Sequence, residues 1–287
     1  MVLMSSGALV IAGTGPAVAD SQGGASHTVR VVGNGTSVQV SDRTVDAGWV
    51  RFRVSSTNTV TQQGGGSSVT LFRLRPHHTL HQFVAHLHDE FSANAKVGAR
   101  GTRELKADAV FRGLVDVVPG YPETVTEKVG AGTWYLMDLG SETASARPHF
   151  TRLSVRDSDD RDHGGSGPHS DLTVTTVHDR FHAPKHWPHE GTYTFRNEDD
   201  TIHFMVMLPV KAGTTDADVQ QALTQPTEPD FLVEGPIGGN DVVSPGRMLK
   251  LTYDLPRGTY VLLCFVADEE TGMPHAVMGM HKVVVLR

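Results

Sequence analysis

The feature that most restricts the fold of this chain is an internal repeat, because the same short sequences occur in the same order in its two halves. The matched pairs are Thr79-Leu80-His81 with Thr201-Ile202-His203, Gly132-Thr133-Trp134 with Gly258-Thr259-Tyr260, and Pro148-His149 with Pro274-His275. Three landmarks in one order indicate a tandem duplication. The chain has 287 residues, which is enough for two ordinary domains. We therefore expect two similar units.

Most segments of both halves have the pattern of β-strands. Short runs such as VRFRV, MLKLTY and YVLLCFV are apolar or alternate with polar residues, and Gly, Pro or Asp bounds them. Helical patterns occur near 97–110 and over 215–224, where Thr215 can cap a helix and Asp218 follows three residues later. We expect an all-β chain of two tandem Greek-key β-sandwiches, each with a short helix.

The charged, Gly-rich segment 157–170 has no apolar periodicity and predicts a linker. It separates a first domain over 27–156 from a second over 171–287. Residues 1–19 contain an apolar run and end in an A-x-A sequence, which is typical of a signal peptide, although the basic region that usually opens one is missing. We expect a secreted or extracytoplasmic protein, with no integral membrane segment once the signal is removed.

Charge and motifs restrict the class of function. The net charge of −7 argues against nucleic acid and anionic membranes as main partners, since both favour basic patches. Neither G-x-S-x-G, H-E-x-x-H nor a P-loop is present. The sixteen histidines are the first indication of metal binding.

The single cysteine, Cys264, narrows the question further. In an oxidising compartment cysteines usually pair, but one cysteine cannot pair within its own chain. It is therefore a buried inert thiol, a reactive thiol or a metal ligand. Taken alone, such a residue is more often a small buried hydrophobe.

Residues around Cys264 favour a metal ligand. Copper that cycles between two oxidation states is suited by two imidazoles, one thiolate and a weak axial thioether. His275 and Met280 follow Cys264 on one loop, and His203 lies on a separate upstream strand. The predicted copper ligands are therefore His203, Cys264, His275 and Met280. Met278 is an alternative axial ligand, and the ten residues between Cys264 and His275 form a loop that could loosen the trigonal plane.

These residues resemble the cupredoxins, the blue (type 1) copper proteins. The resemblance rests on Gly258-Thr259-Tyr260 running into Cys264, then His275 and Gly279-Met280, and on Asn197 a few residues before His203. It covers the strand-rich body of both halves, but the copper motif occurs only in the second. The resemblance implies Greek-key sandwiches, one type 1 copper in the second domain, and electron transfer.

The first half lacks the thiolate, because Asp138 stands where the repeat places Cys264. His81 and His149 stand at the positions matched to His203 and His275. A structural domain without metal is one interpretation, and a two-histidine, one-carboxylate site from His81, Asp138 and His149 is another. The chain also lacks paired His-x-His motifs joined to a His-Cys-His sequence, a combination that is expected for a trinuclear copper centre.

The sequence thus predicts an exported copper protein that passes single electrons to an unknown redox partner protein. No substrate is required, so an electron carrier is favoured over an enzyme. The apolar wall at 274–277 is the expected route, through a solvent-facing edge of His275. Alternatives are a Cu(I) carrier or store, a metal-free cell-surface binding module on the same scaffold, and a copper enzyme that uses both domains.

Overall fold

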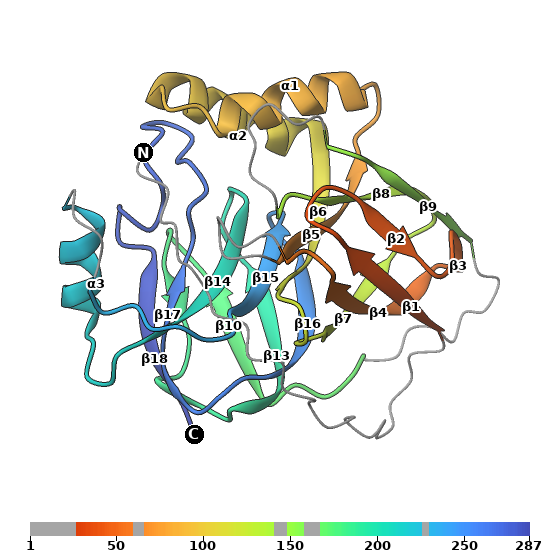
Figure 1. Cartoon of the computed structure of the whole chain (residues 1–287). Coiled ribbons are helices and arrows are strands. Elements are labelled where there is room, and N and C mark those ends of the chain that lie inside the picture. The colour runs from red at the N-terminus through yellow and green to blue at the C-terminus, as the bar shows by residue number, and fades with distance from the viewer. Residues whose placement is uncertain (1–26, 60–65, 141–147, 158–166, 226–229) are drawn as a thin grey trace.

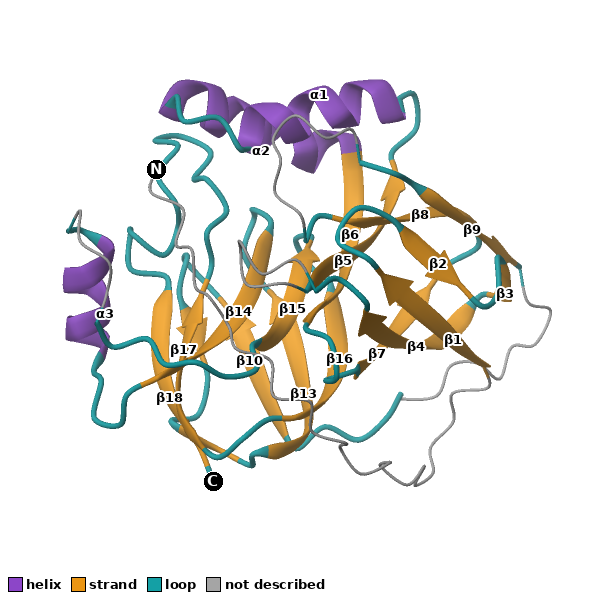
Figure 2. Cartoon of the chain, in the orientation of Figure 1, coloured by secondary structure: helices purple, strands orange, loops and turns teal. Residues whose placement is uncertain are grey.

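The computed structural model describes residues 27–59, 66–140, 148–157, 167–225 and 230–287. The expected signal peptide at 1–19 and residues 158–166 of the expected linker lie outside the described residues. Strands dominate what is described, and helices are few (Figure 2).

The described part of the first half contains nine strands in two sheets. The strands are β1 (His27–Gly33), β2 (Val38–Val40), β3 (Thr44–Asp46), β4 (Gly48–Ser56), β5 (Ser67–Leu74), β6 (Ala109–Val117), β7 (Glu123–Val129), β8 (Gly132–Asp138) and β9 (Thr151–Arg156). Their orders are β7-β4-β1-β2 and β6-β5-β8-β9-β3. Val29, Phe52, Leu71 and Leu136 from the two sheets are fully buried in a common core.

The second half repeats this arrangement strand for strand. Its strands are β10 (Leu172–Thr176), β11 (Phe181–His182), β12 (His186–Trp187), β13 (Glu190–Asn197), β14 (His203–Val210), β15 (Gly238–Val243), β16 (Met248–Asp254), β17 (Gly258–Leu263) and β18 (His281–Leu286). Their orders are β16-β13-β10-β11 and β15-β14-β17-β18-β12. Even the parallel pairs match, β1 with β4 and β10 with β13. The prediction of two tandem β-sandwiches is confirmed.

The helices depart from the prediction of one short helix in each half. The described part of the second half has α3 (Asp216–Leu223), capped by Thr215 with Asp218 as predicted. The described part of the first half has two longer helices, α1 (Leu80–Glu90) and α2 (Ala95–Asp108), which lie side by side across one end of the strands (Figure 1). Thr79, the N-cap, and Gln82 form a capping box that starts α1, so residues 80–87 are helical and are not the counterpart of β14.

The two sandwiches share their sheets. β7 pairs with β16 in one sheet and β6 pairs with β15 in the other, so each sheet runs from one half into the other (Figure 1). In the β7–β16 pair, Thr126 lies opposite Lys250. These two residues are equivalent in the repeat: Thr126 precedes the partner of Gly48 by three positions, and Lys250 precedes the partner of the matching Gly191 by three positions. The halves are thus related by a local two-fold axis through that pair.

Buried carboxyl groups gather on the strands that join the halves. Glu123 and Glu127 of β7 are 6% and 0% exposed, and Glu127 faces Arg112 of β6 at 3.7 Å. Asp241 of β15 accepts a hydrogen bond of 2.8 Å from Ser68. Burial, with Asp241 nearby, raises the pKa of Asp116 on β6 to about 7. Burial also raises the pKa of Glu123 and of Glu127 well above the usual value.

None of the helices in the described residues, α1, α2 and α3, is long and apolar enough to cross a bilayer.

Candidate metal centre

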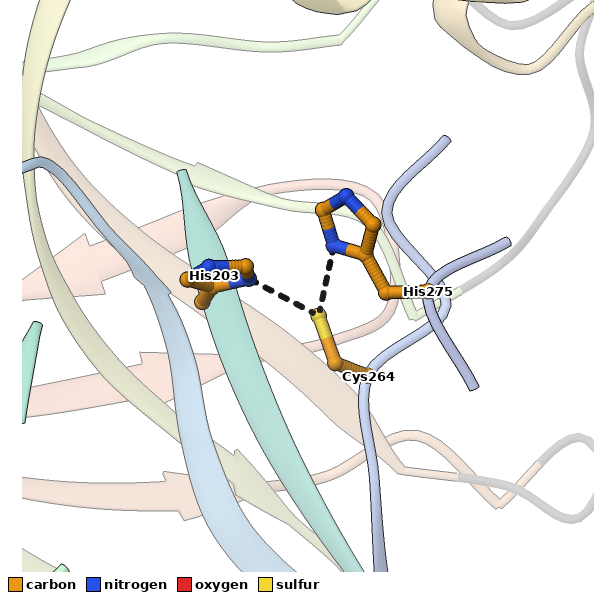
Figure 3. Close-up of side chains that lie close together, drawn as sticks. All are labelled: His203, Cys264 and His275. Atoms are coloured by element: carbon orange, nitrogen blue, oxygen red, sulfur yellow. Dashed lines mark hydrogen bonds between the residues drawn. The ribbon is translucent and has the colours of Figure 1, made fainter. Parts of the chain in front are cut away.

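The fold brings three of the four predicted ligands together in the second half. His203 begins β14, Cys264 directly follows β17, and His275 lies on the loop between β17 and β18. The thiol sulfur of Cys264 lies 3.7 Å from Nδ1 of His203 and 3.7 Å from Nδ1 of His275 (Figure 3). All three side chains are at most 1% exposed.

This geometry suits a single metal ion. The three donor atoms lie within 4.8 Å of one another. An ion about 2.0–2.3 Å from each of three donors in a trigonal plane would hold those donors roughly 3.5–4 Å apart. The observed spacing of 3.7 Å from sulfur to each nitrogen meets that requirement. Two imidazole nitrogens and a thiolate are the donor set that copper prefers in electron-transfer sites.

The loop between Cys264 and His275 is closed by its own hydrogen bonds. The Asp268 carboxylate accepts from the backbone of Glu270 and Thr271, and the Asp268 amide donates to the Met273 carbonyl. At its base, the amides of His275 and Ala276 donate to the carbonyls of Val266 and Cys264. The two arms of the loop thereby hold His275 beside Cys264.

The helical hairpin of the first half anchors this loop. Lys106 of α2 lies 2.6 Å from the Glu269 carboxylate, and Arg103 donates to the Glu269 carbonyl. Glu90 of α1 accepts from the Ala267 amide at 3.4 Å. Gly272 passes so close to α2 that a Cβ there would collide with the Ala95 carbonyl. The length of the loop is therefore explained by its contact with the other half.

The outer nitrogens of both imidazoles face carboxylates. Nε2 of His203 lies 3.3 Å from an Asp199 oxygen and 3.5 Å from an Asp179 oxygen. Nε2 of His275 lies 3.9 Å from the same Asp179 oxygen. The expectation that His275 presents a solvent-facing edge is wrong, since His275 is 1% exposed and the turn that carries Asp179 covers it.

The side chains of the site shift one another's pKa values. Burial alone would raise the pKa of the Cys264 thiol, but hydrogen bonds from His203 and His275 lower it to about 6. Burial would lower the pKa of His203, but the Asp199 carboxylate and the thiolate raise it to about 9. Asp199 is itself held ionised, because the hydrogen bonds from His203 and the turn outweigh burial and lower its pKa to about 2. Without a metal, the thiolate and the His203 imidazolium stabilise each other.

The two candidate axial residues lie in different surroundings. Met280 is fully buried in the core cluster that contains Cys264, and its amide donates to the His275 carbonyl at 2.8 Å. Met278 is partly exposed, and its sulfur accepts from the Thr271 hydroxyl at 3.7 Å. Burial beside the ligands favours Met280.

The corresponding place in the first half is a hydrogen-bonded carboxylate. Asp138 is the last residue of β8, Cys264 directly follows the matched strand β17, and Asp138 accepts from the amides of Gly35, Ser68 and Gly140. When the two halves are matched by their strand registers, the residue of the first half that is equivalent to His203 is Ser67, not His81. His81 is exposed on α1 and His149 is exposed before β9. Among the described residues, Asp138, His81 and His149 form no metal-binding group.

Asp179 and Asp199 are the site residues that the sequence did not reveal. Asp179 lies in the turn between β10 and β11, and Asp199 follows β13, so both are far along the chain from Cys264. The one available signal was the acidic run at 198–200, just before His203, and such a run is typical of an ordinary polar turn.

No family model and no curated protein matches the chain. Among solved structures it is similar to dithionite-reduced auracyanin from Roseiflexus castenholzii, with 26% identity over 40% of this chain and 94% of that one, and a TM-score of 0.27. It is also similar to auracyanin A, a "blue" copper protein from Chloroflexus aurantiacus, with 13% identity over 40% of this chain and 96% of that one, and a TM-score of 0.25.

A longer alignment covers 92% of this chain and 66% of the McoA multicopper oxidase from Aquifex aeolicus, with 10% identity and a TM-score of 0.26. The structural neighbours are cupredoxins and multicopper oxidases. Because each of these TM-scores is below 0.5, the fold is assigned from its strand order and the site from its own geometry.

Proposed function

We propose that this protein is an exported, type 1 copper-binding protein that transfers single electrons through a site formed by His203, Cys264, His275 and Met280. The observation that supports it is the buried arrangement of one sulfur and two Nδ1 atoms at 3.7 Å spacing. Bound copper would supply the one-electron chemistry. The residues of the chain would hold the donors in place and exclude water, since every predicted ligand is at most 1% exposed.

An electron carrier requires that its metal ligands are held rigidly. A site that changes little between two oxidation states needs ligands fixed by the protein and not by the ion. Here the ligand loop is closed by its own hydrogen bonds and is anchored to α1 and α2. The partner of such a carrier would be another redox protein, and small transient contacts suit such an exchange.

The direct test is to add one equivalent of Cu(II) to the purified protein and to record its visible absorption and electron paramagnetic resonance (EPR) spectra. An intense thiolate-to-copper band that bleaches on reduction and returns on oxidation supports an electron carrier. Rapid loss of copper to a Cu(I) chelator after reduction would instead favour the carrier or storage function, and a colourless protein would favour the metal-free binding module.

Copper affinity should rise with pH between about 6 and 9. In this window the Cys264 thiol, with a pKa of about 6, is already ionised, whereas His203, with a pKa of about 9, must lose a proton to bind. Binding of one copper ion should therefore release about one proton from these two groups, and the copper affinity should rise roughly tenfold per pH unit. Chelator competition across this pH range measures the slope, and an affinity independent of pH would contradict the assignment.

Met280→Leu should keep the thiolate-to-copper band but raise the reduction potential. Loss of a weak axial thioether disfavours Cu(II) more than Cu(I), because Cu(I) is satisfied by three ligands. The swap conserves volume, so its cost in stability should be below about 1.5 kcal/mol. Redox titration gives the potential, with Met278→Leu as the control that should leave it unchanged. A shift in the control alone would assign the axial position to Met278.

A further inference from the structure

The outer face of the candidate metal centre is covered by a tight turn. Residues 177–180 connect β10 to β11, with hydrogen bonds in both directions between Val177 and Arg180. The two central residues, His178 and Asp179, have φ angles of 51° and 52°, a region that glycine and asparagine usually fill in such turns. The Asp199 carboxylate accepts from both of their amides at 2.9 Å. The turn is therefore fixed to the segment that precedes His203.

This turn places the Asp179 carboxylate between the two candidate ligand imidazoles. One of its oxygens lies 3.5 Å from Nε2 of His203 and 3.9 Å from Nε2 of His275. His203 already has Asp199 as a hydrogen-bond acceptor at 3.3 Å. Nε2 of His275 is buried and has no hydrogen-bond partner among the described residues, and Asp179 is the carboxylate that faces it. A small inward movement of Asp179 would complete that bond.

We propose that Asp179 is a positioning residue whose carboxylate accepts a hydrogen bond from Nε2–H of His275, as Asp199 does from His203, and that the two carboxylates so keep both Nδ1 atoms directed toward Cys264 and favour the more oxidised state of the bound metal. The proposal deepens the copper-binding function and rests on it. A neutral imidazole carries one proton, so an acceptor at Nε2 leaves the lone pair at Nδ1 for the metal. Carboxylates behind metal-bound histidines act in this way in other metal sites.

The charge of Asp179 has a separate effect. The carboxylate is only 33% exposed, so solvent screens it incompletely. A negative charge near the ion stabilises Cu(II) more than Cu(I), because Cu(II) carries more positive charge. Asp179→Asn keeps an acceptor oxygen and tolerates the left-handed turn, but it removes the charge. Asp179→Ala removes both the charge and the acceptor.

The test compares these two variants with wild type and with a control variant, Glu198→Gln. Glu198 is exposed and next to Asp199 in sequence, and among the described residues it forms an ion pair with Arg196. In Asp179→Asn the ratio of Cu(II) to Cu(I) affinity should fall about tenfold, which is a rise of about 59 mV in reduction potential. Asp179→Ala should show the same rise and, in addition, a changed copper hyperfine splitting in EPR. Glu198→Gln should match wild type in both.

A readout without copper separates this inference from the copper-binding function itself. In the metal-free protein the Cys264 thiolate accepts from Nδ1 of His275, so the thiolate and Asp179 compete for the single proton of the neutral imidazole. Nitrogen-15 NMR at mildly alkaline pH should therefore show a larger population of the Nε2-protonated tautomer of His275 in wild type and in Asp179→Asn than in Asp179→Ala. If wild-type protein gives no thiolate-to-copper band, the proposed function fails, and the NMR result alone decides the role of Asp179.

Three outcomes would overturn the role of Asp179. One is equal potentials and spectra in wild type and both variants. Another is an unchanged His275 tautomer in Asp179→Ala. The third is binding of two metal ions by wild type and one by Asp179→Asn, because Asp179 would then be a metal ligand itself, together with Asp199 and Nε2 of His203.

Discussion

Replacement of Cys264 by serine is expected to abolish the intense visible band of the copper-loaded protein and to lower its Cu(II) affinity by more than about 100-fold. Loss of an outer-shell partner in metal sites typically costs about 10–100-fold, and a directly bound thiolate contributes more. Absorption, EPR and chelator competition measure the loss. The fold should persist, because serine is similar in size and its hydroxyl can take over the hydrogen bonds of the sulfur with His203 and His275.

The matched control for Cys264→Ser is Met273→Leu. Met273 lies on the same loop, is 44% exposed, and makes its loop hydrogen bonds through its backbone and not through its sulfur. Its replacement should leave band and affinity unchanged. A copper signal of equal strength in wild type and Cys264→Ser would show that the metal binds elsewhere, for example at surface histidines, and the electron-carrier function would then be rejected.

The free energy of unfolding should fall as pH rises from about 4.5 to 7, owing to the buried carboxyl groups between the halves. The folded pKa values of Glu123 and Glu127 lie well above 4.5, and that of Asp116 is about 7 against 3.8 for the free side chain. The folded state therefore binds these protons more tightly than the unfolded state does. Their contribution is full below the unfolded pKa and is lost as pH rises through the folded pKa.

Each such group contributes at most about 1.4 kcal/mol per pH unit. The check is denaturant unfolding of the metal-free protein at several pH values across this window, for wild type, Asp116→Asn and Glu127→Gln. Relative to wild type, both variants should gain stability with rising pH. Exposed Asp254→Asn serves as the control and should follow wild type. Parallel curves for all four proteins would show that the carboxyl groups ionise freely in the folded state.

The ordered spacing in the second half predicted the core of the candidate site. Cys264, His275 and Met280 occur close together in sequence, and the loop that carries them is closed locally, so sequence order is enough to place them near one another. His203 is predictable as the imidazole of a separate upstream strand, and the resemblance adds Asn197, whose buried side chain ties the end of β13 to the Thr201 carbonyl just before β14. The β-sandwiches and α3 also followed from local patterns.

Matching the two halves by sequence gave a wrong equivalence where similar residues form different secondary structures. Thr79-Leu80-His81 matches Thr201-Ile202-His203 in sequence, yet Thr79 caps α1 with Gln82 and the real counterpart of His203 is Ser67. The capping pair and the helical spacing of Leu80, Phe83 and Leu87 were available signals. Contacts between the halves were not available, because no local pattern records which strand edges meet or that Asp179 covers His275.

The local two-fold axis between the halves has a consequence for how such a chain could arise. β7 and β16 are equivalent strands, and they pair about equivalent residues, Thr126 and Lys250. In a symmetric homodimer the same surface of each subunit forms the interface, and β7 and β16 meet in this way. Before duplication, a single sandwich could have formed this junction with a second copy of itself. In a single chain the two halves need not stay identical: here one half carries the Cys264 thiol, and the other supplies the helices that hold the loop beside it.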